Sequence, residues 1–226
     1  MDIVFLDNLE FTVDLDELFN TIRMDREDDD ADTVIKMAKD AQSIARPKAL
    51  YRPAYVDEKG DNYVVIDGVK FISRVMSVNL KDVHRVFPFV ATCGTELEDW
   101  SNSIDDMLER YWADAIKIQA LNCAFKAMEV HLEKHFNPGK TACMNPGSLE
   151  DWPISEQAKL FEMLGDVKST VGVLLTDSFL MVPVKSVSGI KFPTETDYEN
   201  CQLCPRENCP NRRAPYDKNL FAKRYL

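Results

Sequence analysis

Three cysteines near the C-terminus have the spacing of metal ligands. Cys201, Cys204 and Cys209 form a C-x2-C-x4-C run. Thiolates on one short loop can converge on a single metal centre, and three of them leave one position to be filled from elsewhere in the chain. The spacing fits a four-iron iron–sulfur cluster or a zinc site, and unliganded thiols are the remaining alternative.

The fourth ligand would come from another thiol or an imidazole. Cys143 lies just before a Pro-Gly loop and is the strongest candidate, whereas Cys93 and Cys123 are expected to be packed thiols. His131 and His135 lie four residues apart, but the H-E-x-x-H frame is absent, so a solvated helix end is the favoured interpretation. The predicted metal ligands are therefore Cys143, Cys201, Cys204 and Cys209.

No other motif in the sequence predicts a reaction centre, because a Gly-rich phosphate loop, a nucleophile elbow and triad spacing are all missing. The net charge of −11 argues against nucleic acid as a partner, although residues 201–226 are basic where residues 1–32 are acidic. Apolar runs are far shorter than the roughly 18 residues of a membrane span. The first ten residues are acidic where a signal peptide is basic, so we expect a soluble, cytoplasmic protein with no membrane partner.

The elements that must position these residues follow an α+β pattern. Asp67-Gly68, between two β-rich runs, predicts a hairpin. A loop is expected at 137–153, followed by a helix that Ser155 caps and Gly165 ends. Helices are predicted at residues 33–45, 97–136 (as one helix or two) and 155–164. Strands are predicted at residues 49–56, 63–66, 69–72, 85–90, 171–175, 179–184 and 186–192.

The apolar content of 45% is enough for the core of one domain spanning residues 1–226. Residues 1–48 are predicted to form an N-terminal extension with a strand and a helix, and residues 194–226 a Cys-rich metal-binding tail. This tail is too poor in apolar residues to build a core of its own, so something else must order it.

Three motifs occur together between residues 145 and 192. They are Asn145-Pro146-Gly147-Ser148, then Trp152-Pro153, and above all the segment from Met181 to Ile190 that contains Ser186-Val187-Ser188-Gly189. In this combination they resemble the activation domain of cobalamin-dependent methionine synthase and its free-standing relatives. The resemblance implies a single α+β unit, with an antiparallel sheet and packed helices, that docks on a cobalamin-binding domain. It also implies a cofactor site, for S-adenosylmethionine, lined by Asn145, Pro146, Gly147, Ser148, Ser186, Ser188 and Gly189.

Three departures from the family pattern affect that site. Cys143 stands where the resemblance implies an arginine, Ser148 where it implies a tyrosine, and Asn137 where it implies an acidic residue. Three polar contacts to S-adenosylmethionine are therefore missing, while Cys143 and the cysteine run would meet where the family holds this ligand.

The leading hypothesis is an iron–sulfur protein that passes one electron from an upstream donor to cob(II)alamin on a separate corrinoid protein or methyltransferase. Two alternatives stay open. One is a reactivation domain that still binds S-adenosylmethionine and has only a structural metal. The other is a non-enzymatic, zinc-braced docking module for a corrinoid methyltransferase.

Overall fold

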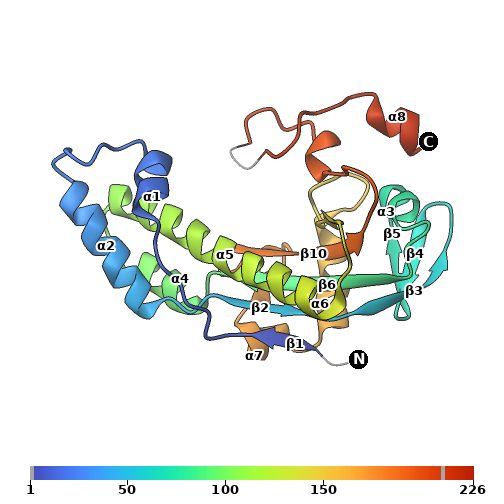
Figure 1. Cartoon of the computed structure of the whole chain (residues 1–226), viewed down its shortest axis with the longest axis horizontal. Coiled ribbons are helices and arrows are strands. Elements are labelled where there is room, and N and C mark those ends of the chain that lie inside the picture. Colours follow the sequence, from blue (N-terminus) through green and yellow to red (C-terminus); the bar gives the residue numbers. More distant parts are fainter. Residues whose placement is uncertain (1–2, 210–211) are drawn as a thin grey trace.

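The chain folds as an α+β protein around an eight-stranded antiparallel sheet (Figure 1), which confirms the predicted fold class. The computed structural model describes residues 3–209 and 212–226. The strand order is β1-β2-β6-β3-β4-β5, with β10 paired to β6 and β7 paired to β10. The strands are β1 (Val4–Leu6), β2 (Lys48–Tyr51), β3 (Ala54–Lys59), β4 (Tyr63–Ile66), β5 (Val69–Ile72), β6 (Arg85–Thr92), β7 (Thr141–Met144) and β10 (Ser186–Pro193).

Helices cover the sheet, and a small ribbon of two further strands lies beside it. The helices are α1 (Leu15–Ile22), α2 (Ala31–Ile44), α3 (Arg74–Asn79), α4 (Thr95–Asn102), α5 (Met107–Phe136), α6 (Gln157–Leu164), α7 (Val167–Val171) and α8 (Leu220–Arg224), with the short 3-10 turns η1 (Ile154–Glu156) and η2 (Asn200–Gln202). The ribbon pairs β8 (Leu174–Leu175) with β9 (Met181–Val182). Within the described ranges, no helix is long and apolar enough to cross a membrane.

Strand β6 is the centre of the sheet, because it pairs with β2, β3 and β10. Pro88 lies in the middle of β6 and has no backbone N–H to donate. The Arg52 N–H donates to the Pro88 carbonyl (3.2 Å), but the return bond cannot form. The strand predicted at 49–56 is accordingly divided into β2 and β3 at this point.

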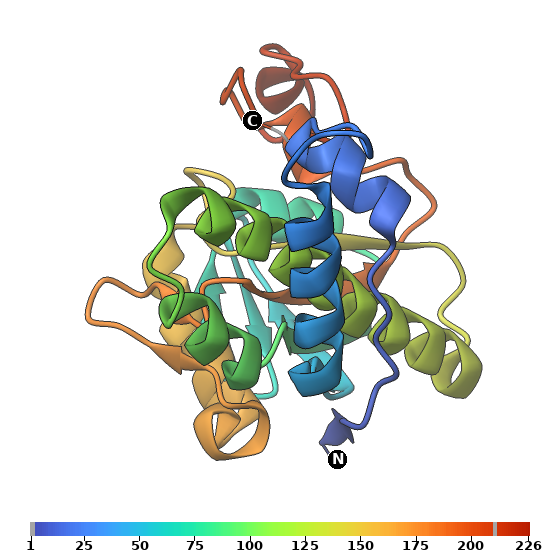
Figure 2. The same ribbon diagram turned by 90° about the vertical axis from the view of Figure 1, so that its left-hand side faces the viewer.

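Alternate residues of the central strands point to opposite faces, and different helices cover each face. Helix α5 crosses one face (Figure 1), where Tyr51 and Phe87 pack with Met128. On the other face Leu50 belongs to a core that includes Leu160 of α6. The N-terminal helices α1 and α2 pack with α4 against the first half of α5, as Figure 2 shows from that end.

Several local predictions are confirmed. The Asp67-Gly68 hairpin has positive φ at both turn residues (44° and 79°), as a two-residue turn between twisted strands requires. The long helical region is two helices, because the Asp106 carboxylate accepts the N–H groups of Leu108 (2.8 Å) and Glu109 (3.0 Å) and starts α5.

Other local predictions are wrong. Helix α3 was not predicted, and β7 lies inside the expected loop at 137–153. Helix α7 extends into the strand expected at 171–175. Ser155 does not cap α6, because it lies inside the 3-10 turn η1 that precedes this helix, although Gly165 does end it.

Candidate functional site

The loop after β7 contains four of the predicted ligand residues, Asn145, Pro146, Gly147 and Ser148. The Gly147 N–H donates to the Trp152 carbonyl (2.8 Å) and closes the loop. Gly147 has a φ of +78°, a conformation in which a side chain is disfavoured. The turn between the predicted ligand residues and Trp152 therefore depends on a glycine.

Asp151 fastens the end of this loop to α3. Its carboxylate accepts the backbone N–H groups of Arg74 (3.1 Å) and Val75 (2.9 Å) and the hydroxyl of Ser73. A carboxylate at a helix N-terminus is favoured by the helix dipole and by the free N–H groups there. The loop is thus held against α3 by several hydrogen bonds.

Asn145 links the loop to β10 and to the C-terminal tail. Its Nδ2 donates to the Ser188 carbonyl (2.8 Å), and its Oδ1 accepts from Asn200 Nδ2 (2.9 Å). The Cys143 thiol also approaches this oxygen (Sγ–Oδ1 3.6 Å). Since Asn200 directly precedes Cys201, one amide group places β7, β10 and the cysteine run side by side.

The hydroxyls of the predicted ligand residues on β10 have partners inside the protein. Ser188 is buried and donates to Gln157 Oε1 (2.6 Å). The Ser186 hydroxyl donates to the Pro183 carbonyl (2.7 Å), and its oxygen lies 2.9 Å from Thr92 Oγ1. Their assignment to a cofactor site stays a prediction, and the structure gives both hydroxyls a role in joining elements.

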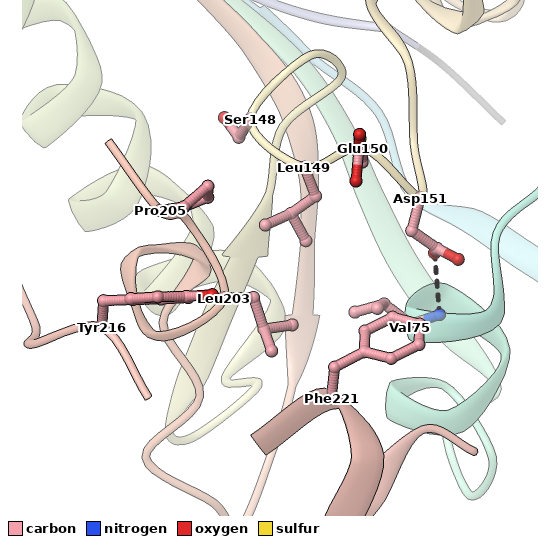
Figure 3. Close-up of a pocket in the computed structure, with 9 residues that line it drawn as sticks. All are labelled: Val75, Ser148, Leu149, Glu150, Asp151, Leu203, Pro205, Tyr216 and Phe221. Atoms are coloured by element: carbon pink, nitrogen blue, oxygen red, sulfur yellow. Dashed lines mark hydrogen bonds between the residues drawn. The ribbon is translucent and has the colours of Figure 1, made fainter. Parts of the chain in front are cut away.

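A cavity of about 700 Å³ lies between the Pro-Gly loop, α3 and the tail (Figure 3). Ser148 is the predicted ligand residue that borders it, and the Glu150 carboxylate lies on the same wall. The remaining lining is mostly apolar or aromatic and comes from Val75, Leu149, Asp151, Leu203, Pro205, Tyr216 and Phe221. Leu203 and Pro205 are the neighbours of Cys204, so the thiol-bearing loop, which comprises residues 201–206, forms part of the cavity wall.

The predicted metal ligands lie in one neighbourhood but do not form a ligand set. The Arg213 N–H donates to Cys201 Sγ (3.4 Å), and the three tail thiols are partly buried and free. Within residues 3–209 and 212–226, no three side chains of His, Cys, Asp or Glu are grouped as a metal ion requires. The set Cys143, Cys201, Cys204 and Cys209 is therefore not assembled in this conformation.

Cys143 has a strongly perturbed thiol. Burial raises its pKa to about 11, and the positive charges of Lys191 and Arg213 oppose this rise without cancelling it. Lys191 lies directly opposite Cys143 in the pairing of β7 with β10. The Cys143 side chain is therefore a neutral thiol at physiological pH.

The other candidate ligands lie elsewhere. Cys93 is fully buried, as expected of a packed thiol, and burial raises its pKa to about 12. Cys123 is only partly buried, with its Sγ 3.5 Å from the Glu10 carbonyl, so its assignment to the core is wrong. His131 Nδ1 and Tyr51 Oη share a hydrogen bond (2.7 Å), and the His131 ring stacks on the exposed ring of His135.

Two aromatic residues outside the sequence motifs order the tail. Tyr198 and Tyr225 are 3% and 1% exposed and belong to the main core. Their hydroxyls donate to Asn200 Oδ1 (2.7 Å) and Asn79 Oδ1 (3.2 Å). The presence of aromatic residues in an otherwise polar segment was the sequence signal that could have identified these two anchors. The tail is thus fixed near both ends by side chains that are not metal ligands.

Comparison with known proteins agrees with this architecture. The model of the family described as vitamin B12 dependent methionine synthase, activation domain, matches residues 144–212. Among solved structures, the MetH reactivation domain bound to AdoHcy is similar, with 15% sequence identity and a TM-score of 0.62 over 88% of this chain and 81% of that one. No curated protein matches.

The chain shares its fold with the MetH reactivation domain, since the structural similarity extends over most of both chains. The family resemblance inferred from the motifs is confirmed as well, because the match to the activation-domain family covers the segment that contains the Pro-Gly loop, β10 and the cysteine run.

We predict that Asn145→Ala loosens the tail. The substitution removes the amide that joins Asn200 to the Ser188 carbonyl, and unpaired buried polar groups cost about 1–3 kcal/mol. Trypsin should cleave at Lys218 and Lys223 faster than in the wild type, and chemical denaturation should show the loss of stability. Ser148→Ala, in the same loop, is the control, and equal cleavage of both variants would contradict the role of Asn145.

The thiol of Cys143 should react with iodoacetamide slowly near pH 7. Because its pKa is raised to about 11, the thiolate fraction and the rate should rise about tenfold per pH unit up to that value. Mass spectrometry of the labelled peptide measures the rate. Lys191→Met removes a cation that lowers this pKa, so it should slow the reaction further, and a faster reaction would show that the electrostatic assignment is wrong.

Proposed function

We propose that this chain reactivates a separate corrinoid protein of a methyltransferase system by docking on its cobalamin-binding domain. The family match and the reactivation-domain fold support this role. The observation that carries the proposal is the shared cavity: residues of the Pro-Gly loop in the matched segment and of the thiol-bearing loop both line it. Chemistry at the thiols would therefore take place beside the loop that the family model matches.

We further propose that the thiols of Cys201, Cys204 and Cys209 bind an iron–sulfur cluster, with Cys143 as the nearest candidate for the fourth ligand. The support is their spacing and the position of Cys204 between Leu203 and Pro205, two residues that line the cavity. Since the thiols are not grouped in the described conformation, binding requires the loop to adjust. Such a cluster supplies one-electron chemistry, and an electron from an upstream donor protein would reduce cob(II)alamin to cob(I)alamin.

The anchoring of the tail bears on the zinc-braced alternative. A structural metal is needed where a segment cannot order itself. Here Tyr198 and Tyr225 are buried in the core, and the tail is also bound through Asn200. These contacts order the tail without a metal, which supports a functional use of the thiols over a bracing one.

Cys204→Ser is expected to abolish both the cluster and the reactivation. Protein purified without oxygen should show broad visible absorption that bleaches on reduction, and with a low-potential reductant it should convert cob(II)alamin on a partner domain to cob(I)alamin. Cys123→Ser is the matched control and should retain both properties. Stoichiometric zinc without acid-labile sulfide would refute the cluster, and absence of reactivation by the wild type would refute the role.

A second candidate function is reactivation that uses S-adenosylmethionine. The cavity favours it, because the Glu150 carboxylate could face a sulfonium cation and the rings of Tyr216 and Phe221 could contact an adenine. The similar solved structure, that of the MetH reactivation domain, contains the related molecule AdoHcy. One argument is against it. Asn137, Cys143 and Ser148 stand where the resemblance implies residues that contact S-adenosylmethionine, so three contacts are missing.

Calorimetry with S-adenosylmethionine distinguishes the two candidates. Each missing contact costs about 1–3 kcal/mol, and about 1.4 kcal/mol is a factor of ten in affinity, so we expect no binding at micromolar concentrations. A micromolar dissociation constant that Glu150→Gln weakens would instead establish the second candidate.

A further inference from the structure

Cys201 and Cys204 lie on one closed turn of the thiol-bearing loop. The Cys204 N–H donates to the Cys201 carbonyl (3.4 Å), and the Leu203 N–H donates to the Asn200 carbonyl (3.1 Å). The Arg212 guanidinium binds the same turn, because it donates to the carbonyls of Cys201 (3.0 Å) and Cys204 (3.2 Å). In such a four-residue turn the first and last Cα atoms are less than about 7 Å apart. The two cysteines are therefore neighbours in space as well as in sequence.

This backbone geometry is the one that a disulfide requires. Two cysteines cannot be bridged without backbone movement where their Cα atoms are more than about 7 Å apart. Cys201 and Cys204 satisfy this condition, so rotation of the two side chains can bring the sulfur atoms together. A metal ion requires more, and no three ligand side chains are grouped in the part of the chain that the structure describes. The observed turn thus suits two thiols that react with each other.

The surroundings of the thiols distinguish this pair from the other cysteines. Cys201 and Cys204 are partly buried and free, so a small oxidant can reach them. The Arg213 N–H donates to Cys201 Sγ (3.4 Å), and this contact would stabilise the negative charge on the sulfur when it acts as a nucleophile. Cys93 is fully buried, and the raised pKa of Cys143, about 11, keeps its thiol protonated.

We propose that Cys201 and Cys204 are a reversible dithiol–disulfide couple that a low-molecular-weight disulfide oxidises. The Cys201 thiolate attacks one sulfur of the oxidant, which forms a mixed disulfide and releases one thiolate. The Cys204 thiolate then attacks Cys201 Sγ, which releases the second thiolate and closes the bond between the two cysteines. The protein thereby loses two electrons and two protons, and the oxidant gains both and becomes two thiols.

Oxidation of the pair would act on two features of the proposed site. The ring that the disulfide closes contains Leu203, which lines the cavity, so the oxidation state fixes or frees this part of the wall. A disulfide also removes two thiolates, so oxidation and cluster binding exclude each other. The inference goes beyond the proposed cluster and does not rest on it, because the couple forms in metal-free protein.

The test uses the full chain, freed of metal with a chelator and equilibrated without oxygen in mixtures of reduced and oxidised glutathione. The protein is then quenched, alkylated and digested with trypsin, which cleaves after Lys191 and Arg206. Both cysteines of the pair remain in one peptide, and Cys209 lies in the next. As oxidised glutathione increases, the first peptide should lose its alkyl groups and weigh two hydrogen atoms less than the dithiol form, and dithiothreitol should reverse this. A pair that stays reduced, or that forms a cross-link to another peptide instead, would overturn the proposal.

Two variants define the roles of the thiols. Cys204→Ser should stop at the mixed disulfide, so Cys201 should carry glutathione and the internal disulfide should be lost completely. Cys209→Ser is the matched control and should oxidise at the same glutathione ratio as the wild type; loss of the disulfide in this variant would overturn the assignment. Because the experiment contains no metal, its failure leaves the proposed cluster in place, and failure to bind a cluster leaves the couple in place.

Discussion

The close pairing of β7 with β10 is the constraint on which the candidate site depends. Residues 141–144 lie opposite residues 190–193, and this register continues into the contact of Asn145 with the Ser188 carbonyl. A Cβ at Gly189 would lie 2.5 Å from the Met144 carbonyl oxygen and 2.7 Å from Asn145 Nδ2. Any side chain at this position would push the strand and the loop apart. The Pro-Gly loop, the Asn200 contact and the cavity wall all follow from an approach that only glycine allows.

Local sequence signals were sufficient to predict the secondary structure where a segment determines its own conformation. The Asp67-Gly68 turn and the strand at 186–192 are examples, because turn chemistry and β-rich composition agree there. They were insufficient for β7, whose four residues become a strand only by pairing with β10. In α7 the strand propensity of the valines is outweighed by Asp166, which accepts the Ser169 N–H (3.0 Å), and by Gly172, which ends the helix at φ +77°.

The candidate site was predictable in its location more than in its contacts. Motifs placed Cys143, the Pro-Gly loop and the cysteine run in one neighbourhood, and the Asn145 amide provides that connection. The orientation of the Ser188 hydroxyl could not be read from the motif, because its partner Gln157 lies on another element. The cavity could not be predicted from the sequence either, since four of its nine lining residues come from the tail and its shape is set by tertiary packing.

Whether Cys143 can serve as a ligand is decided by two opposing energies. Where the family resemblance implies an arginine, this chain has a thiol, yet Lys191 and Arg213 keep positive charge beside it. Burial outweighs these charges and raises the pKa from 9.0 to about 11, so removing the proton costs roughly 3 kcal/mol more than it does in water. Structural zinc sites release about 10–16 kcal/mol on binding. Shared among four ligands, this is about 2.5–4 kcal/mol for each, close to the cost of removing the Cys143 proton, so ligation by Cys143 would be finely balanced at neutral pH and would strengthen as the pH rises.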